Sequence, residues 1–349
     1  MHMLIFGHGY CAAALTPQLI SRGWSVSGTT RGDPARVTAS GARAIEWTGD
    51  EAALLGEISR ADAVLSCVAP VAVAAGTAPA DERAAGNSNK PSFSPPVVRY
   101  DPADGDPADR QGAPSPTYFD PVLDRFGHAL RQARPRWLGY VSSTSVYGDH
   151  GGGWVDETTP PHPGFPRAQA RLEAEMAWAG LSAEAGWPLT IFRLAGIYGP
   201  GRGPFAKLRA GTARRIIRPG QIFSRIHVAD VAGAILASLD RTPSGDNVSC
   251  CSEGSAGVPV GASIFNLCDD DPAPPENTIE VAAGMLGMPV PEAEAFETAQ
   301  MSTMARSFYH DSKRVRNDRL KDLLGYRLLY PDLRSGLDDI LRQEGEAQP

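Results

Sequence analysis

Residues 3–12, MLIFGHGYCA, place a short apolar run directly before two glycines and the start of a helical pattern. Gly7 permits a tight turn after the apolar strand, and Gly9 lets an anionic group approach backbone N–H groups at the helix N-terminus. Ala12 is small enough for the helix to pack closely against the strand. A G-x-G-x-x-A turn at the first strand–helix junction predicts a binding site for the pyrophosphate of a dinucleotide.

The pattern around this turn repeats along the chain. Further strand candidates alternate with helical patterns over residues 24–30, 42–47, 62–68, 136–143 and 189–196. This alternation predicts a Rossmann-type α/β fold, a doubly wound parallel sheet with helices on both faces. We expect a Rossmann domain over 1–198 and a smaller C-terminal substrate lobe over 199–349. Segments 226–240 and 263–268 are expected to return to the Rossmann layer.

Two stretches interrupt the alternation. Residues 73–116 are rich in Ala, Pro, Gly, Asp and Ser and contain few large apolar residues, and residues 242–262 are similar but shorter. Such segments bury too little apolar surface to offset the entropy lost on ordering. The sequence therefore predicts a flexible insertion over 73–116, and a tolerated expansion of a loop is the simplest interpretation of both stretches.

The end of the second predicted strand bears on which dinucleotide is bound. An NAD site places Asp or Glu there to hold the ribose 2′-hydroxyl, but this sequence reads Gly28-Thr29-Thr30-Arg31. Arg31 can pair with a 2′-phosphate, and the hydroxyls of Thr29 and Thr30 can donate to it. The sequence favours NADP, with NAD the less favoured alternative. Asp50, beyond the third predicted strand, is a candidate acceptor for the adenine amine.

Three further motifs, 141–148 (VSSTSVYG), 189–201 (LTIFRLAGIYGPG) and 224–232 (SRIHVADVA), follow the glycine turn in this order. Together the four blocks resemble the extended short-chain dehydrogenases, the NAD-dependent epimerase/dehydratase family. The resemblance implies a Rossmann domain that holds NAD(P) and a C-terminal lobe over the nicotinamide. It also implies further cofactor-binding positions, namely Tyr10, Cys11, Val68, Ala69, Ser142, Ala195 and Ile197.

The resemblance implies a catalytic set of Ser or Thr followed by Tyr-x-x-x-Lys. Ser143 matches the serine, which would hydrogen-bond a substrate carbonyl or hydroxyl. The tyrosine and lysine positions carry Arg167 and Arg171, and Glu175 stands where the family commonly has a glutamate. Arginine is a permanent cation without an acceptor, so Arg167 cannot be a general base. Arg171 could still bind the cofactor ribose or a phosphate.

Other positions depart from the family pattern. Thr144 and Ser145 replace the Asp-Glu pair of the sugar dehydratases, so dehydration is not expected. Phe223 stands where nucleotide-sugar epimerases often have a diphosphate-binding arginine, which weakens a UDP-sugar assignment. Asp120 aligns with a structural or proton-relay asparagine of the family.

Three residues beyond Ser143 are candidate replacement acids or bases: Tyr147, Asp149 and His150. Packing within the VYG turn is the alternative for Tyr147, and an exposed loop is the alternative for His150. A basic cluster could meet an anionic substrate or be a solvated face; it consists of Arg209, Arg214, Arg215 and Arg218. His227 and Asp230 are interpreted as structural residues that fix the helix returning to the sheet.

Composition limits the partners. The formal charge of −7 disfavours a general nucleic-acid surface, and no apolar run is long enough to span a bilayer. Cysteine spacing matches neither a metal site nor a disulfide framework, the adjacent Cys250-Cys251 included. From the apolar run at residues 3–6 we expect a strand at the start of the sequence and no signal peptide. We expect a cytoplasmic protein with a small-molecule substrate and leave a homodimer open.

The leading function is an NADP-dependent oxidoreductase or epimerase-like enzyme, and the competitor is a catalytically silent NADP(H)-binding sensor or interaction protein.

Overall fold

The fold is built on one parallel sheet. The computed structural model describes residues 1–47, 51–73, 117–241 and 262–346. Seven strands pair in the order β13-β9-β7-β4-β1-β2-β3, all parallel. Their bounds are β1 (His2–Phe6), β2 (Ser25–Thr30), β3 (Arg43–Glu46), β4 (Ala63–Ser66), β7 (Trp137–Ser143), β9 (Leu189–Leu194) and β13 (Ala262–Leu267). The Rossmann-type fold predicted from the sequence is confirmed.

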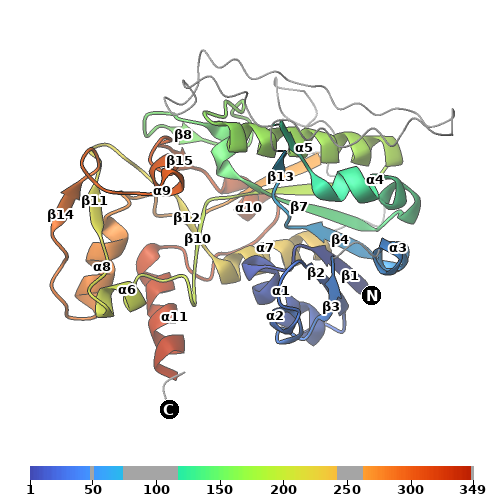
Figure 1. Ribbon diagram of the computed structural model, residues 1–349, viewed down its shortest axis with the longest axis horizontal. Coiled ribbons are helices and arrows are strands. Elements are labelled where there is room, and N and C mark those ends of the chain that lie inside the picture. Colours follow the sequence, from blue (N-terminus) through green and yellow to red (C-terminus); the bar gives the residue numbers. More distant parts are fainter. Residues whose placement is uncertain (48–50, 74–116, 242–261, 347–349) are drawn as a thin grey trace.

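Both faces of the sheet are covered by helices, as Figure 1 shows. The inner strand β1 is buried throughout its apolar part, and successive side chains point to opposite faces. Met3 and Ile5 pack in one core with the helices α1 (Tyr10–Ser21) and α7 (Val228–Asp240). Leu4 and Phe6 pack in a second core with α3 (Glu51–Arg60), α4 (Pro121–Ala133) and α5 (Pro166–Ala185). A short helix, α2 (Ala35–Thr38), follows β2.

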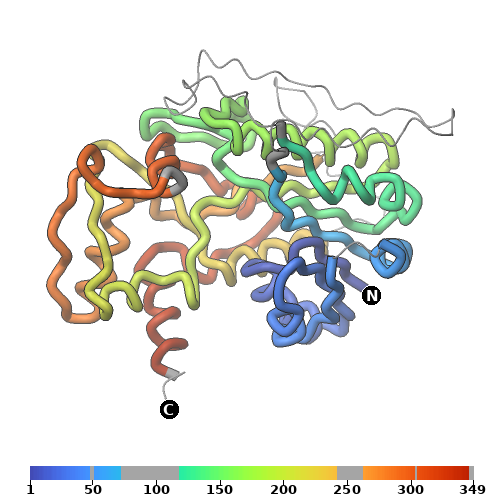
Figure 2. The backbone as a smooth tube through the Cα atoms, in the orientation of Figure 1, coloured from blue at the N-terminus to red at the C-terminus, as the bar shows by residue number. Residues whose placement is uncertain are grey.

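A smaller lobe lies at one end of the sheet, drawn in yellow to red in Figures 1 and 2. Its elements include α6 (Phe205–Arg209), β11 (Arg215–Ile217), α8 (Asn277–Met285), β14 (Ala293–Ala295), α9 (Thr303–Ser307) and α11 (Leu333–Glu346). Strand β11 pairs with β14, and a separate apolar cluster joins α6, α8 and α11. The lobe therefore has its own small core.

Short pairs of strands connect the lobe to the Rossmann layer. Strand β10 (Gly196–Tyr198) pairs with β12 (Arg225–His227), and β8 (Trp154–Val155) pairs with β15 (Arg314–Val315). A one-turn helix, α10 (Asp318–Asp322), follows β15. The segments predicted to return to the Rossmann layer contain α7 and β13, which lie beside α1 and β9.

The predicted insertions fall almost entirely outside the described residues, as do Asp50 and the pair Cys250-Cys251. Strand β5 (Val71–Val73) pairs antiparallel with β6 (Thr117–Phe119), so the chain leaves and re-enters the described fold at adjacent points. Across the parts of the chain that the structure describes, no helix combines the length and apolar character needed to cross a bilayer.

Candidate functional site

The residues predicted to bind a dinucleotide meet at one edge of the sheet, because parallel strands end on the same side. The glycine turn follows β1, which lies between β4 and β2 at the point where the strand order reverses. Ligands of open α/β sheets bind in the crevice at such a point. Gly7 has a φ of +75°, and a Cβ added there would lie 2.9 Å from Cγ2 of Val68. The turn is thus closely packed against the residues that follow β4.

The N-terminus of α1 carries unused donors. Gly9 is the N-cap residue, no side chain caps the helix, and its first turn contains no acidic residue. The N–H of Ala13 donates to the Gly9 carbonyl at 2.9 Å, so the N–H groups before it have no acceptor within the helix. A Cβ added at Gly9 would meet, among the described residues, only the Gly7 carbonyl oxygen, at 3.9 Å. This donor set and open backbone fit a pyrophosphate.

The two threonine hydroxyls at the end of β2 contact backbone N–H groups, which bears on whether they can bind a ribose or phosphate. Thr29 is buried, and its hydroxyl accepts from the Gly7 N–H at 2.8 Å, so this side chain holds the glycine turn. A direct role for the Thr29 hydroxyl toward a 2′-phosphate does not match this burial. The hydroxyl of Thr30 accepts from the Gly32 N–H at 3.0 Å. Arg31 is exposed and forms no ion pair with a described residue.

The structure also explains Gly28, the residue before the two threonines. The ring of His8 packs directly on this glycine, where any Cβ would collide with it. Nε2 of His8 lies 2.8 Å from the Thr16 hydroxyl, and burial lowers the pKa of the ring. His8 lies between the two glycines of the turn, and no sequence motif indicated that its ring would pack on Gly28.

Arg171 reaches the carboxyl ends of β4 and β7. Its Nη1 donates to the carbonyl oxygens of Val141 at 3.0 Å and Val68 at 3.4 Å, and to the Tyr140 hydroxyl at 3.1 Å. Ser143, the last residue of β7, is half-buried, and its hydroxyl accepts from the Ser145 N–H at 3.2 Å. The structure therefore brings Arg171 and the end of the strand that carries Ser143 to the same sheet edge as the glycine turn.

Arg167 lies one helical turn before Arg171 and is exposed. Its guanidinium carbon is 5.8 Å from the ring centroid of Phe165 and 5.9 Å from that of Phe308, which belongs to the C-terminal lobe. No carboxylate among the described residues pairs with it. The tyrosine position of the resembled family is thus occupied by an unpaired cation between two aromatic rings.

The glutamate of α5 belongs to a buried network. Glu175 and Arg193 are fully buried, and Nη2 of Arg193 lies 2.7 Å from Oε2 of Glu175. The Ser142 hydroxyl also donates to Glu175. The Glu175 side chain therefore faces the interior and not the cofactor edge. Tyr147 is fully buried beside Arg193 and donates its hydroxyl to Oδ1 of Asn266 at 2.8 Å.

This placement corrects the catalytic assignment of Tyr147. A proton-transfer group must reach the substrate, but the Tyr147 hydroxyl is committed to Asn266 inside the core, and burial raises its pKa further above neutrality. Packing in the VYG turn, the alternative from the sequence, describes what the residue does.

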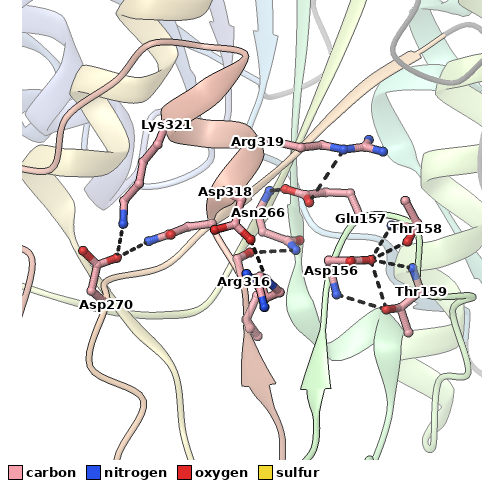
Figure 3. A network of polar contacts seen from close by, with 12 residues as sticks. Asp156, Glu157, Thr158, Thr159, Asn266, Asp270, Arg316, Asp318, Arg319 and Lys321 are labelled. Carbon is pink, nitrogen blue, oxygen red and sulfur yellow. Dashed lines mark hydrogen bonds and ion pairs between the residues drawn. The ribbon is translucent and has the colours of Figure 1, made fainter.

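Figure 3 shows how Asn266 is held. Oε1 of Glu157 accepts from the Asn266 N–H at 2.7 Å, and Oε2 lies 3.9 Å from Nε of Arg319. The Asn266 side-chain amide donates to the carbonyl of Arg316 at 3.2 Å. Glu157 is almost fully buried, and this burial raises its pKa to about 7. The network links the VYG turn to the C-terminal segment and supports the candidate functional site from the protein interior.

Two other acid–base candidates hold a loop. Oδ1 of Asp149 accepts from the Ser312 N–H at 2.8 Å and from the Gly151 N–H at 3.2 Å. His150 is half-buried, and its Nε2 lies 3.1 Å from the Tyr147 carbonyl. Both side chains are therefore engaged in fixing the loop after the VYG turn.

Asp120 caps a helix. Its Oδ1 accepts from the Val122 and Leu123 N–H groups at the start of α4, and Oδ2 accepts from Nε1 of Trp178 at 2.9 Å. Burial raises the pKa of this carboxyl. The structure shows a structural role for Asp120 as an N-cap.

Most of the basic cluster is paired within the C-terminal lobe. Arg209 pairs with Glu344, Arg214 with Glu294, and Arg215 with Glu280 at 2.9 Å. Arg218 instead lies over the ring of Phe296, at 5.0 Å from its centroid. The first three arginines are therefore partly neutralised by carboxylates and are weak candidates for holding an anionic substrate.

The structural interpretation of His227 and Asp230 is confirmed. Nδ1 of His227 accepts from the Ala229 N–H at the start of α7. Asp230 accepts from the Tyr326 hydroxyl at 2.9 Å and from the N–H groups of Leu329 and Tyr330. The IHVAD motif thus fixes the return helix and ties the C-terminal segment to it.

The remaining predicted cofactor positions lie around the same edge. Tyr10 and Cys11 open α1 and are half-buried, Val68 packs on the glycine turn, and Ala69 is exposed. Ala195 and Ile197 follow β9, and the Ala195 N–H donates to the Leu267 carbonyl at 3.0 Å.

Comparison with known proteins agrees with this arrangement. The sequence profile of the NAD dependent epimerase/dehydratase family matches residues 124–251. Protein YeeZ of Escherichia coli (strain K12) is 32% identical over 228 residues, which are 65% of this chain and 70% of that protein. A functionally unknown conserved protein from Silicibacter pomeroyi DSS is 38% identical, covers 98% of each chain and gives a TM-score of 0.74. The human epimerase family protein SDR39U1 with NADPH shares the fold, at 16% identity over 98% of this chain and 99% of that chain, with a TM-score of 0.59.

Proposed function

Because the chain belongs to the NAD-dependent epimerase/dehydratase family, we propose that it is an NADP-dependent oxidoreductase. It would transfer hydride between the nicotinamide and a carbonyl or carbinol carbon of a small molecule. The observation that carries this proposal is the meeting of Arg171 and the Ser143-bearing end of β7 beside the glycine turn. An epimerase-like reaction, which passes through the same hydride step, fits the same residues.

Separate groups of residues in the chain would bind the cofactor and the substrate. The N–H groups at the start of α1 would hold the pyrophosphate, and Thr30 and Arg31 would face the 2′-phosphate. Residues 28–31, at the end of β2, contain no carboxylate that would favour NAD. SDR39U1, with its NADPH, is a distant example of this choice in the same fold. Arg171, fixed by the carbonyls of Val68 and Val141, would bind the nicotinamide ribose.

On the substrate side, the bound cofactor supplies the hydride. Ser143 would donate a hydrogen bond to the substrate oxygen. Arg167 would stabilise the negative charge that develops there, because its guanidinium has no carboxylate partner among the described residues. It cannot give up a proton, so the alkoxide would take its proton from water, which reaches this exposed position.

Dehydration and nucleotide-sugar chemistry are disfavoured. Thr144 and Ser145 provide no acid–base pair beside Ser143. Phe223, at the position of the diphosphate-binding arginine, packs on Tyr309 with ring centroids 5.6 Å apart. Position 223 therefore supplies an aromatic ring and not the cation that a diphosphate would need there.

A silent NADP(H)-binding sensor or interaction protein is the second candidate. It is favoured by the burial of Tyr147 and by the two arginines at the positions of the proton-transfer pair. Under this alternative the cofactor site is kept and no turnover occurs.

Deuteride transfer separates the two candidates. NADPH deuterated at C4 of the nicotinamide would be incubated with a panel of aldehydes and ketones, and the alcohols analysed by mass spectrometry. We expect deuterium in at least one product and its loss in Ser143→Ala with NADPH binding retained. Tight NADPH binding without label transfer to any carbonyl would support the silent binder.

The double variant Arg167→Tyr/Arg171→Lys rebuilds the usual pair of the family. We expect it to bind NADPH within about tenfold of the wild type, because the glycine turn and Arg31 contribute most of the binding. Loss of any native turnover would support substrate anchoring by the arginines. A collapse of NADPH binding by several orders of magnitude in the folded variant would contradict both candidates, because the arginines would then be primary cofactor ligands.

A further inference from the structure

The start of α1 is held against the YGPG turn, which lies far away in the sequence. Tyr10, the first residue of α1, donates its hydroxyl to the Pro200 carbonyl at 2.9 Å. Gly199 has a φ of +147°, and a Cβ added there would lie 2.7 Å from the Tyr10 hydroxyl oxygen and 2.8 Å from Cγ1 of Val228. Only glycine lets the turn approach this closely. Residues 199–202 are therefore fixed beside the N-terminus of α1.

Arg202, the residue after this turn, stacks on the same tyrosine. Its guanidinium carbon lies 4.2 Å from the centroid of the Tyr10 ring, and the side chain is exposed. Burial raises the pKa of the Cys11 thiol to about 11, and the positive charge of nearby Arg202 opposes that rise.

The hydrogen-bonding groups of Arg202 are free in the described part of the chain. No described carboxylate or carbonyl pairs with its guanidinium, whereas Arg209, Arg214 and Arg215 in the following segment each have a glutamate partner. Stacking on an aromatic ring fixes the guanidinium plane and leaves its N–H edges able to bind an anion. The guanidinium of Arg202 thus lies against the side chain of Tyr10, the first residue of α1, whose N-terminus has no side-chain cap.

We propose that Arg202 binds the pyrophosphate of the nicotinamide cofactor and closes the glycine turn from the side of the C-terminal lobe. The inference rests on the cofactor binding in the proposed function. Backbone N–H groups of the helix supply only partial positive charge to a group that carries two negative charges, and a guanidinium adds a full charge with paired donors. Because the chain continues from Arg202 into α6, the bound cofactor would also tie the two lobes together.

The test compares Arg202→Gln with Arg209→Gln, an equal change in net charge at an arginine that is paired with Glu344. Dissociation constants for NADPH and NADH would be measured by isothermal titration calorimetry at fixed salt. For Arg202→Gln we expect both nucleotides to bind roughly tenfold more weakly, as for loss of a hydrogen bond to a charged group. The NADPH/NADH ratio should stay the same, because both cofactors contain the pyrophosphate. Arg209→Gln should bind both as the wild type does.

Arg31→Gln is the complementary variant, because it should weaken the binding of NADPH and leave the binding of NADH unchanged. Arg202→Gln affinities within about twofold of the wild type would overturn the inference while leaving the proposed function intact. A loss confined to NADPH would also overturn it, since Arg202 would then meet the 2′-phosphate. Failure of the wild type to bind either nucleotide would refute the proposed function itself.

Discussion

The buried ion pair between Glu175 and Arg193 gives a prediction of large effect. Glu175→Gln keeps the size of the side chain but removes its charge and replaces one acceptor oxygen by an NH2 donor. In the wild type both side chains are fully buried, and Nε and Nη2 of Arg193 donate to the carboxylate at 2.7–3.2 Å. The variant leaves a guanidinium buried without its counter-charge, and breaking such a pair costs about 3–5 kcal/mol.

The size of this loss can be judged against the whole protein. Net stabilities of folded proteins are about 5–15 kcal/mol, so the change would remove a large fraction of the total. Chemical denaturation followed by circular dichroism and fluorescence would measure it, with agreement of the two probes as the check for two-state unfolding. Arg209→Gln is the control: the pair Arg209–Glu344 is partly exposed, and its loss should cost no more than about 1 kcal/mol.

A second variant separates charge burial from packing. Glu175→Leu combined with Arg193→Met replaces both charges by apolar groups, and we expect it to recover most of the stability lost in Glu175→Gln, because neither partner is left uncompensated. A cost of less than about 1 kcal/mol for Glu175→Gln alone would refute the reasoning. It would mean that water or a neighbouring group satisfies Arg193 as well as Glu175 does.

Three further predictions concern other sites. Arg31→Asp should reverse the preference from NADP toward NAD, because a ribose-hydroxyl acceptor replaces a phosphate partner; equal affinity ratios in the wild type and the variant would contradict this assignment. Burial raises the pKa of Glu157 from 4.5 to about 7, so the folded state favours the protonated form. The contribution of Glu157 to the free energy of unfolding should therefore fall, by up to about 3 kcal/mol, as pH rises from about 4.5 to 7, and then level off. Asp269, whose burial raises its pKa to about 8, adds a slope of the same sign, so Glu157→Gln should reduce the measured slope without abolishing it. An unchanged slope would exclude Glu157 as one of its sources. Asp230→Asn should cost about 1–3 kcal/mol by weakening the hydrogen bonds to Tyr326 and Leu329, and should speed hydrogen exchange in the C-terminal segment; unaltered exchange there would argue against the anchor.

The sequence alone determined the fold and the position of the cofactor turn. Both depend on local patterns: apolar strands that alternate with helical segments, and two glycines placed where a strand meets a helix. The apolar run of β1 and the glycine that begins α1 can both be read from residues 2–12. The motif order also placed Arg167 and Arg171 on one helix, and the structure then showed that Arg171 reaches two strand ends.

The tertiary structure decided how individual side chains are used. Tyr147 was a candidate acid in the sequence, but its hydroxyl meets Asn266, which lies 119 residues further along the chain. In the sequence, Arg209, Arg214 and Arg215 form part of one cationic cluster. In the structure each pairs with a glutamate from a distant part of the lobe.

Arg202 is the converse case: its neighbours in the sequence do not indicate that it could bind an anion. The contact that positions it joins Tyr10 to a turn 190 residues away. Local propensity and periodicity report which backbone a segment adopts, since they depend on neighbours in the chain. Whether a charged or hydroxyl group is paired, buried or free depends on which distant segments the fold brings against it, and that is settled only when the whole core is packed.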